Sequence, residues 1–330
     1  MKQSVSSPRS ISFGVTLCAA LAASSQLLGC ASDAGDGAAA TGSGGVGGSA
    51  GAGGASDSAG AATAGAGAAG SALPAVHVDS KPSAGCGQPT SRRSDGGNSI
   101  DVKGVSRSFV LHLPSGYDAT KPWPLVFAFH GKGDLAENLD GGNFRFQMLG
   151  GAANVLVYPQ ALPDPKLNNQ PSFERDAADD LLFIDALLGD LESGLCIDES
   201  RVFALGHSLG STFVQTLGCQ RAGTIRGIAP QSGGAGATAS CGGPVAAWIG
   251  YGLQDSASAV AVSKARKAFW LAANHCDLAT ESKGSPSPPC VSYRCDSGYP
   301  VEWCEEPLGT HSWSPWMTES IFDFFGAFAP

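Results

Sequence analysis

The chain has 330 residues, a formal net charge of −9 at pH 7 and no cluster of Lys or Arg. An acidic protein without a basic patch is a poor partner for nucleic acid, so we exclude that class. From about residue 83 the composition is globular, and the length that remains is ordinary for a single α/β domain.

The first 29 residues have the features of an export signal. Lys2 and Arg9 give a positive start, and a largely apolar stretch follows over residues 11–28. The sequence Leu27-Leu28-Gly29-Cys30 resembles the lipobox of bacterial lipoproteins, which implies cleavage before Cys30 and lipidation of its thiol. The alternatives are an ordinary secretory signal or an uncleaved anchor, with Cys30 incidental. We expect an exported protein, either secreted or a lipoprotein of the outer membrane or cell surface that touches the membrane only through its lipid.

The segment after the signal is a predicted linker. Apart from Val46, residues 31–72 are only Ala, Gly, Ser, Thr and Asp. Such a segment has too little apolar surface to offset the entropy of ordering, so we expect a disordered linker over 30–82. The remaining residues, 83–330, then form the globular domain, which we expect to be a monomer.

Short apolar runs alternate with helical patterns along this domain. Strands are predicted over residues 107–113, 124–129, 154–158, 202–205, 227–229, 246–249 and 301–303, and helices over 179–191, 258–273 and 316–328. This alternation predicts an α/β fold with a mostly parallel, doubly wound sheet and helices on both faces. Reactive groups in such sheets gather at the carboxyl ends of the strands.

The strongest chemical signal is the sequence Gly206-His207-Ser208-Leu209-Gly210, a G-x-S-x-G motif between a predicted strand and a helix. This is the context of the nucleophile elbow of the α/β-hydrolase fold, in which flanking glycines permit a sharp turn that exposes the Ser hydroxyl. The alternative is a structural Ser in a turn. We predict Ser208 to be the nucleophile.

A Ser hydroxyl needs a base that is itself oriented by an acid, and in this fold the order is Ser, acid, His. His311 lies in a loop before the last helix and is favoured over His275, at the end of a predicted helix. Asp255 follows the strand at 246–249. Its rivals Asp277 and Asp296 lie in a Cys-rich segment with no predicted strand before them, although Asp255 could instead cap the next helix.

Two backbone N–H groups are candidates for the oxyanion hole, those of Leu209 and Lys132. Lys132 lies in the turn His130-Gly131-Lys132-Gly133 after the strand at 124–129, and His130 is interpreted as a structural hydrogen-bonding residue. Three tryptophans near the base, Trp303, Trp313 and Trp316, form either an aromatic wall for the substrate or part of the core.

Eight cysteines remain when Cys18 and Cys30 are set aside. In an exported chain an even number indicates disulfides, here up to four, with 105 connectivities open. Zinc binding, with His275-Cys276 and Cys290-x4-Cys295 as ligands, is the alternative, but no C-x2-C pair is present. We therefore predict no metal, and disulfides among Cys86, Cys196, Cys219, Cys241, Cys276, Cys290, Cys295 and Cys304.

The globular part resembles the feruloyl esterase and polyhydroxybutyrate depolymerase-like α/β-hydrolases, relatives of carbohydrate esterase family one. The resemblance rests above all on the run from Cys196 to Gly210 (CIDESRVFALGHSLG). It extends to FHGKG at 129–133, VYPQA at 157–161, the stretches at 84–87, 104–118, 240–246 and 251–255, and Gly298-Tyr299-Pro300-Val301. The sequence departs from the family pattern at Ser211, where a second Gly is frequent, and at Lys132, where many relatives have a Cys or an apolar residue.

The resemblance implies Ser208, Asp255 and His311 as the triad and no cofactor. It implies an ester substrate, such as feruloyl or acetyl groups on plant cell-wall polysaccharide. Three alternatives stay open at this point. One is an aliphatic polyester depolymerase, another is a non-catalytic carbohydrate-binding lipoprotein on the same fold, and a third is a peptidase.

Overall fold

The computed structural model describes residues 75–330, with the exception of 91, 174–176, 237–240, 287–288 and 297. The predicted signal peptide, Cys30 and most of the predicted linker therefore lie outside the described residues. Within the described part, no helix has the length and apolar character needed to cross a bilayer.

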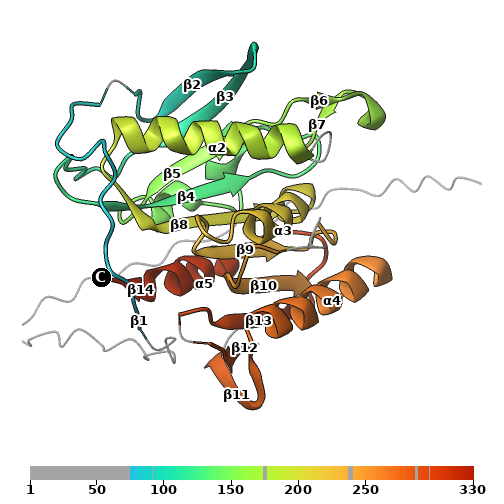
Figure 1. The fold of residues 1–330 in the computed structure, drawn as a ribbon. Coiled ribbons are helices and arrows are strands. Elements are labelled where there is room, and N and C mark those ends of the chain that lie inside the picture. Colours follow the sequence, from blue (N-terminus) through green and yellow to red (C-terminus); the bar gives the residue numbers. More distant parts are fainter. Residues whose placement is uncertain (1–74, 91, 174–176, 237–240, 287–288, 297) are drawn as a thin grey trace, which may run out of the picture. The chain divides into compact units, whose positions relative to one another are not determined.

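A ten-stranded sheet runs through the centre, in the order β11-β12-β13-β10-β9-β8-β4-β5-β3-β2 (Figure 1). Its strands are β2 (Gly96–Val102), β3 (Val105–His112), β4 (Trp123–Phe129), β5 (Val155–Pro159), β8 (Ile197–His207), β9 (Gly227–Gln231), β10 (Ala246–Gly252), β11 (Asp277–Pro286), β12 (Pro289–Arg294) and β13 (Val301–Glu306). The six central strands from β13 to β5 pair in parallel, whereas antiparallel pairs form both edges. The predicted mostly parallel sheet is confirmed.

Helices pack on both faces of this sheet. Helices α2 (Ala177–Gly194), α3 (Leu209–Gln220) and α4 (Ala257–Ala273) contribute to one apolar core, and α1 (Phe146–Gly150) and α5 (Pro315–Gly326) to another. The central strands contribute side chains to both cores because successive side chains of a strand point to opposite faces of the sheet. Shorter elements are β1 (Val76–His77), β6 (Pro163–Asp164), β7 (Gln170–Pro171), β14 (Phe328–Ala329) and the 3-10 helices η1 (Ala136–Asp140) and η2 (Pro165–Leu167).

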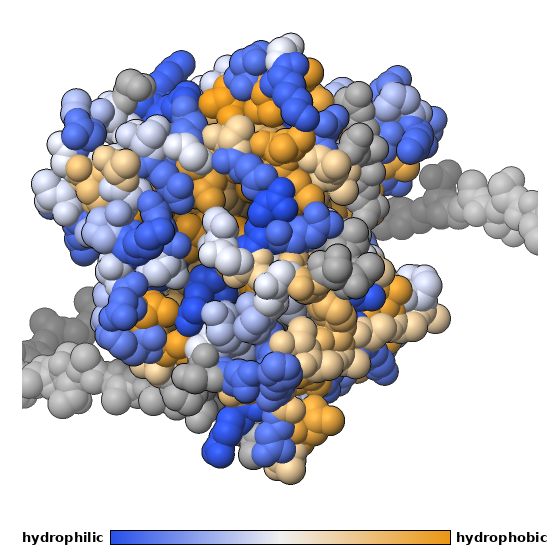
Figure 2. All heavy atoms as spheres, in the orientation of Figure 1, coloured by the Kyte–Doolittle hydropathy of each residue, from blue (hydrophilic) through white to orange (hydrophobic). Residues whose placement is uncertain are grey.

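The outer surface is mixed in polarity. Figure 2 shows the face that carries α2 and α4, where hydrophilic residues are interspersed with smaller apolar areas. Leu182 on α2 is one of the exposed apolar side chains, at 37% exposure. Scattered apolar residues of this kind are ordinary on a protein surface.

The ordered region begins before the predicted boundary at residue 83. Val76 of β1 pairs in parallel with Phe328 of β14, and the hydroxyl of Ser80 donates to buried Asp198 at 2.8 Å. Burial alone would raise the pKa of Asp198, but hydrogen bonds from Ser200, Lys81, Ser80 and Arg201 bring it down to about 2. Residues 75–82 are thus part of the fold. The sequence placed the boundary too late because the partners of these residues are distant in the sequence.

The strands at the two edges were missed by the sequence analysis. β2 alternates between half-buried and exposed residues, and β11 and β12 form a polar hairpin beside β13. Edge strands carry few of the apolar residues that reveal a buried strand. One consequence concerns the rivals of Asp255, since Asp277 begins β11 and Asp296 follows β12. The premise that no strand comes before them was wrong for Asp296, which follows β12, whereas Asp277 follows α4.

Candidate active site

Ser208 lies in a sharp turn between β8 and α3. Its backbone has φ 58° and ψ −121°, a conformation that a residue with a side chain rarely adopts. The glycines on either side are sterically required. A Cβ on Gly206 would lie 2.7 Å from the Gly210 carbonyl, and one on Gly210 would lie 2.3 Å from the Phe129 carbonyl oxygen. This geometry is that of a nucleophile elbow.

The structure brings Ser208, His311 and Asp255 together. The Ser208 hydroxyl donates to His311 Nε2 at 2.9 Å, and His311 Nδ1 donates to Asp255 Oδ2 at 2.8 Å. Ser208 follows β8, Asp255 follows β10, and His311 lies in the loop between β13 and α5. The Asp255 side chain is 6% exposed whereas that of His311 is 50% exposed, so the acid is buried and the imidazole faces the cavity.

The rivals for these roles lie elsewhere. His275 Nδ1 contacts Asp296 Oδ2 at 2.5 Å, with side chains 73% and 55% exposed. This is a hydrogen-bonded pair on the surface, and among the described residues neither side chain contacts Ser208, Asp255 or His311. Asp277 caps the backbone N–H of Ala279 at 2.9 Å within the edge hairpin.

The two candidate oxyanion donors flank the Ser208 side chain. Leu209 is the first residue of α3, where an N–H group has no acceptor one turn earlier in the helix. Gly131, before Lys132, approaches Ser208 so closely that a Cβ there would lie 3.3 Å from Ser208 Cβ. Within the part of the chain that the structure describes, the Lys132 N–H donates no hydrogen bond, so it is free to meet an anion.

His130 fixes the shape of the turn that carries Lys132. Its Nδ1 donates to the Gly131 carbonyl at 2.7 Å, and its Nε2 accepts from the Ala161 N–H at 3.2 Å. Burial lowers the pKa of His130, so the ring is neutral at pH 7 in this arrangement. Its contacts agree with the predicted structural role.

Ser211, one of the departures from the family pattern, packs beneath Gly233. A Cβ on Gly233 would lie 2.3 Å from Ser211 Oγ, so the extra hydroxyl is accommodated by a glycine on the neighbouring loop. Ser211 itself is fully buried. The elbow therefore keeps its geometry with Ser at this position.

A cavity of about 510 Å³ opens over these groups. It is lined by Gly131, Lys132, Gly133, Asp134, His207, Ser208 and His311. A second hollow of about 440 Å³ is lined by Glu137, Asn138, Gly141, Gly142, Asn143, Phe144 and Trp313. Phe144 and Trp313 both contact the His207 ring, with centroids 5.9 and 6.2 Å away, so side chains that line the second hollow pack against a residue that lines the first.

Of the three tryptophans considered for an aromatic wall, Trp313 lines the second hollow. It is 3% exposed, so little of its ring is open to solvent. Trp303 packs on Tyr251 with centroids 4.7 Å apart, and Trp316 on Trp248 at 6.3 Å. Phe144, in the segment between β4 and β5, was missed because nothing in its local sequence points to a site.

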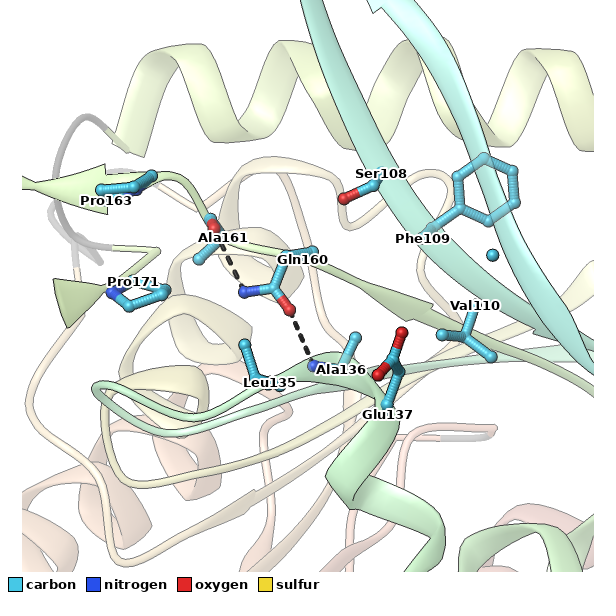
Figure 3. A pocket seen from close by; sticks show the side chains of 11 residues that line it. Ser108, Phe109, Val110, Leu135, Ala136, Glu137, Gln160, Ala161, Pro163 and Pro171 are labelled. Carbon is cyan, nitrogen blue, oxygen red and sulfur yellow. Dashed lines mark hydrogen bonds between the residues drawn. The ribbon is translucent and has the colours of Figure 1, made fainter.

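A third, more apolar hollow of about 340 Å³ lies beside the segment that follows the Lys132 turn. Figure 3 shows Gln160 at its centre, between Leu135 and Ala136 on one side and Ala161 on the other. The Gln160 amide oxygen accepts from Ala136 N–H at 2.8 Å, and its nitrogen lies 3.1 Å from His130 Nε2. None of its lining residues lines the cavity at Ser208.

The eight cysteines form four disulfides, as expected. The pairs are Cys86–Cys196, Cys219–Cys241, Cys276–Cys295 and Cys290–Cys304. The cysteines of the alternative zinc site are thus bonded to each other or to Cys304, and their thiolates are not available to a metal.

The fold and the elbow define the class of protein: the chain has the α/β-hydrolase fold. A CE1 ferulic acid esterase from Anaeromyces mucronatus, solved in complex with ferulic acid, superposes with a TM-score of 0.53 at 17% identity, covering 70% of this chain and 90% of the other. No protein-family model matches the chain.

Curated relatives are feruloyl esterases. Feruloyl esterase D of Neurospora crassa is 27% identical over 78% of this chain and 94% of its own length. Probable feruloyl esterase C of Aspergillus niger is 30% identical over 56% of this chain and 66% of its own length. The chain therefore has homologues among the feruloyl esterases, and the resemblance noted in the sequence is confirmed.

Proposed function

We propose that the protein is a serine carboxylic-ester hydrolase that releases hydroxycinnamoyl or acetyl groups from plant cell-wall polysaccharide. The observation that carries this proposal is the unbroken hydrogen-bond series from Ser208 through His311 to Asp255. It lies beside two N–H donors on an open cavity. The feruloyl esterase homologues favour an aromatic acyl group.

The geometry suits a two-step acyl transfer. Ser208 Oγ attacks the ester carbonyl carbon while its proton passes to His311 Nε2, and the tetrahedral oxyanion is met by the N–H groups of Lys132 and Leu209. The alcohol leaves as the C–O bond breaks, taking the proton from His311. Water then attacks the acyl-enzyme, gives a proton to His311, and the acid is released as Ser208 recovers that proton.

Asp255 orients the base and stabilises its cation. Its carboxylate accepts a hydrogen bond from the Nδ1–H group of His311, so the proton stays on Nδ1 and Nε2 is unprotonated and directed at Ser208. Losing the correct tautomer costs about 10⁴-fold in turnover in a Ser-His-Asp enzyme. The buried position of Asp255 strengthens this interaction because solvent screens it less.

The test is hydrolysis of methyl ferulate, acetylated xylan and a polyhydroxybutyrate suspension by the wild-type protein and by Ser208→Ala. We expect hydrolysis of one of the first two substrates, and a fall of at least about 10³-fold in Ser208→Ala. Release of hydroxy acids from the polyester alone would replace this proposal with a depolymerase. Undiminished turnover by Ser208→Ala would remove Ser208 from the mechanism.

We also propose that this domain is exported and held at the cell envelope by a lipid on Cys30, after a signal over 1–29 and a linker. Four disulfides support an oxidising compartment. Metabolic labelling with a radioactive fatty acid should mark the wild-type protein and not Cys30→Ala. Equal labelling of both would rule out Cys30 as the attachment site.

A further inference from the structure

His207, the residue before Ser208, makes a hydrogen bond to the backbone of the candidate base. Its Nε2 lies 2.7 Å from the carbonyl oxygen of His311. A carbonyl only accepts, so Nε2 carries the proton and donates it. The residue before the nucleophile is thereby joined to the backbone of the base itself, 104 positions away in the sequence.

The surroundings of His207 hold this ring in place. The ring lies 5.2 Å from the His311 ring and packs against Phe144 and, perpendicularly, Trp313. Trp313 is held in turn by Thr318, whose hydroxyl accepts from the indole N–H at 2.9 Å and donates to the Phe144 carbonyl at 2.6 Å. The Nε2–H group of His207 is therefore directed by a packed aromatic wall.

Other hydrogen bonds hold the His311 loop on either side of residue 311, including those from the Gly309 N–H to the Glu306 carbonyl at 3.1 Å and between the Thr310 and Ser312 hydroxyls at 3.1 Å. Gln254 N–H donates to the Gly309 carbonyl at 2.8 Å, and the Gln231 side chain reaches the Ser312 carbonyl at 3.4 Å. Among the described residues, the bond from His207 is the one hydrogen bond made by the backbone of residue 311 itself. Since the His311 side chain is 50% exposed, side-chain packing alone holds it weakly.

We propose that His207 is a positioning residue: its Nε2–H group holds the backbone of His311 so that the imidazole stays aligned between Ser208 and Asp255. The inference rests on the proposed esterase function. Burial lowers the pKa of His207 to about 4, so the ring remains neutral while His311 becomes a cation during turnover. A neutral donor fixes the base without repelling its charged form.

The test compares His207→Leu, which removes the donor, with His207→Gln, whose amide nitrogen reaches about as far as Nε2. We expect kcat on methyl ferulate to fall by about 10- to 100-fold in His207→Leu with little change in KM, because small misplacements of a reacting group are costly. His207→Gln should keep kcat within about threefold of wild type. His77→Leu, in β1 and outside the cavity, is the matched control and should match wild type.

The proposal is overturned if the Leu and Gln variants are equally active or equally impaired, or if the loss appears only in KM. A second measurement is independent of turnover: the low-field proton resonance of the His311–Asp255 hydrogen bond should persist in His207→Gln and be lost or exchange-broadened in His207→Leu. If wild type hydrolyses no ester, the esterase proposal fails and this resonance alone decides the role of His207. Its persistence in all variants refutes that role.

Discussion

At the scale of single residues, the site depends on backbone that only particular amino acids allow. Ser208 holds a positive φ because the glycines two positions before and after it leave room for the elbow. The Gly210 position is the tighter of the two, since its neighbour is the carbonyl oxygen of Phe129 at the end of β4. The same contact therefore links the elbow to the strand that precedes the Lys132 turn.

Gly210→Ala should damage this arrangement. The new methyl group would meet backbone atoms at 2.3 Å, so α3 or the end of β4 has to move, and with it an oxyanion donor. We expect kcat to fall by more than about 10-fold and the free energy of unfolding to fall by about 1–3 kcal/mol. Ester turnover and urea unfolding measure the two effects.

Gly189→Ala in α2 is the matched control, because nothing lies within 4 Å of the added Cβ. It should leave kcat unchanged and raise the free energy of unfolding by about 0.5–1 kcal/mol. Equal effects of the two substitutions on kcat and on the free energy of unfolding would show that the close contact at Gly210 matters for neither.

At the scale of elements, the segment between β4 and β5 forms a wall of the site. A side chain from β3 holds it in place through contacts outside the cavity. His112 at the end of β3 is buried, with Nδ1 2.7 Å from Asp95 and Nε2 2.6 Å from Asp140 at the end of η1. Tyr158 donates to Asp140 at 2.6 Å, and Gln147 to Asp95 at 2.8 Å. One imidazole thus ties η1 and the turn before β2 to the sheet.

The contacts of His112 could not be predicted from the sequence, whereas several strands of the sheet could. The apolar runs of β4, β5, β8 and β10 predicted strands correctly, because strands buried on both faces are continuously apolar. The candidates Ser208, Asp255 and His311 were chosen from the order Ser, acid, His that this fold has, together with where the predicted strands end. The roles of His112 and His207 depend on ring directions and on partners far along the chain, which no local pattern encodes.

The His112 anchor should make stability depend on pH. Burial alone would lower the pKa of His112, but Asp140 and Asp95 more than offset this and raise it. A group with a raised pKa contributes its full stabilisation below its unfolded pKa, about 6.5, and loses it as pH rises through the folded pKa. Wild-type stability should therefore decline as the pH rises above about 6.5.

His112→Gln is expected to make that decline smaller, with the part caused by buried Glu302, whose pKa is raised to about 7, remaining, and to lower the free energy of unfolding by about 2 kcal/mol at pH 6. Guanidinium unfolding at pH 6 and pH 9 measures both. If the variant and the wild type lose stability in parallel between these pH values, His112 is not the titrating anchor.

At the scale of the whole molecule, the disulfides differ in how much of the fold they close. Cys86–Cys196 joins the segment before β2 to the start of β8 across 110 positions, whereas Cys276–Cys295 closes only 19 positions beside the edge hairpin. The number of bridges was expected from the even count of cysteines. The pairing was not, because it depends on which strands become neighbours in the sheet.

Removing the long bridge should cost more stability than removing the short one. Chain entropy predicts about 5 kcal/mol for a loop of roughly 110 residues and about 3 kcal/mol for roughly 19 residues, because a longer closed loop restricts the unfolded chain more. The comparison is Cys86→Ala/Cys196→Ala against Cys276→Ala/Cys295→Ala, followed by guanidinium unfolding of each. Since Cys86 also brings the N-terminal segment against β8, the first variant should in addition expose residues 75–86 to proteolysis. An equal or larger loss for the short bridge would show that the edge hairpin, and not loop closure across the domain, governs the stability of this fold.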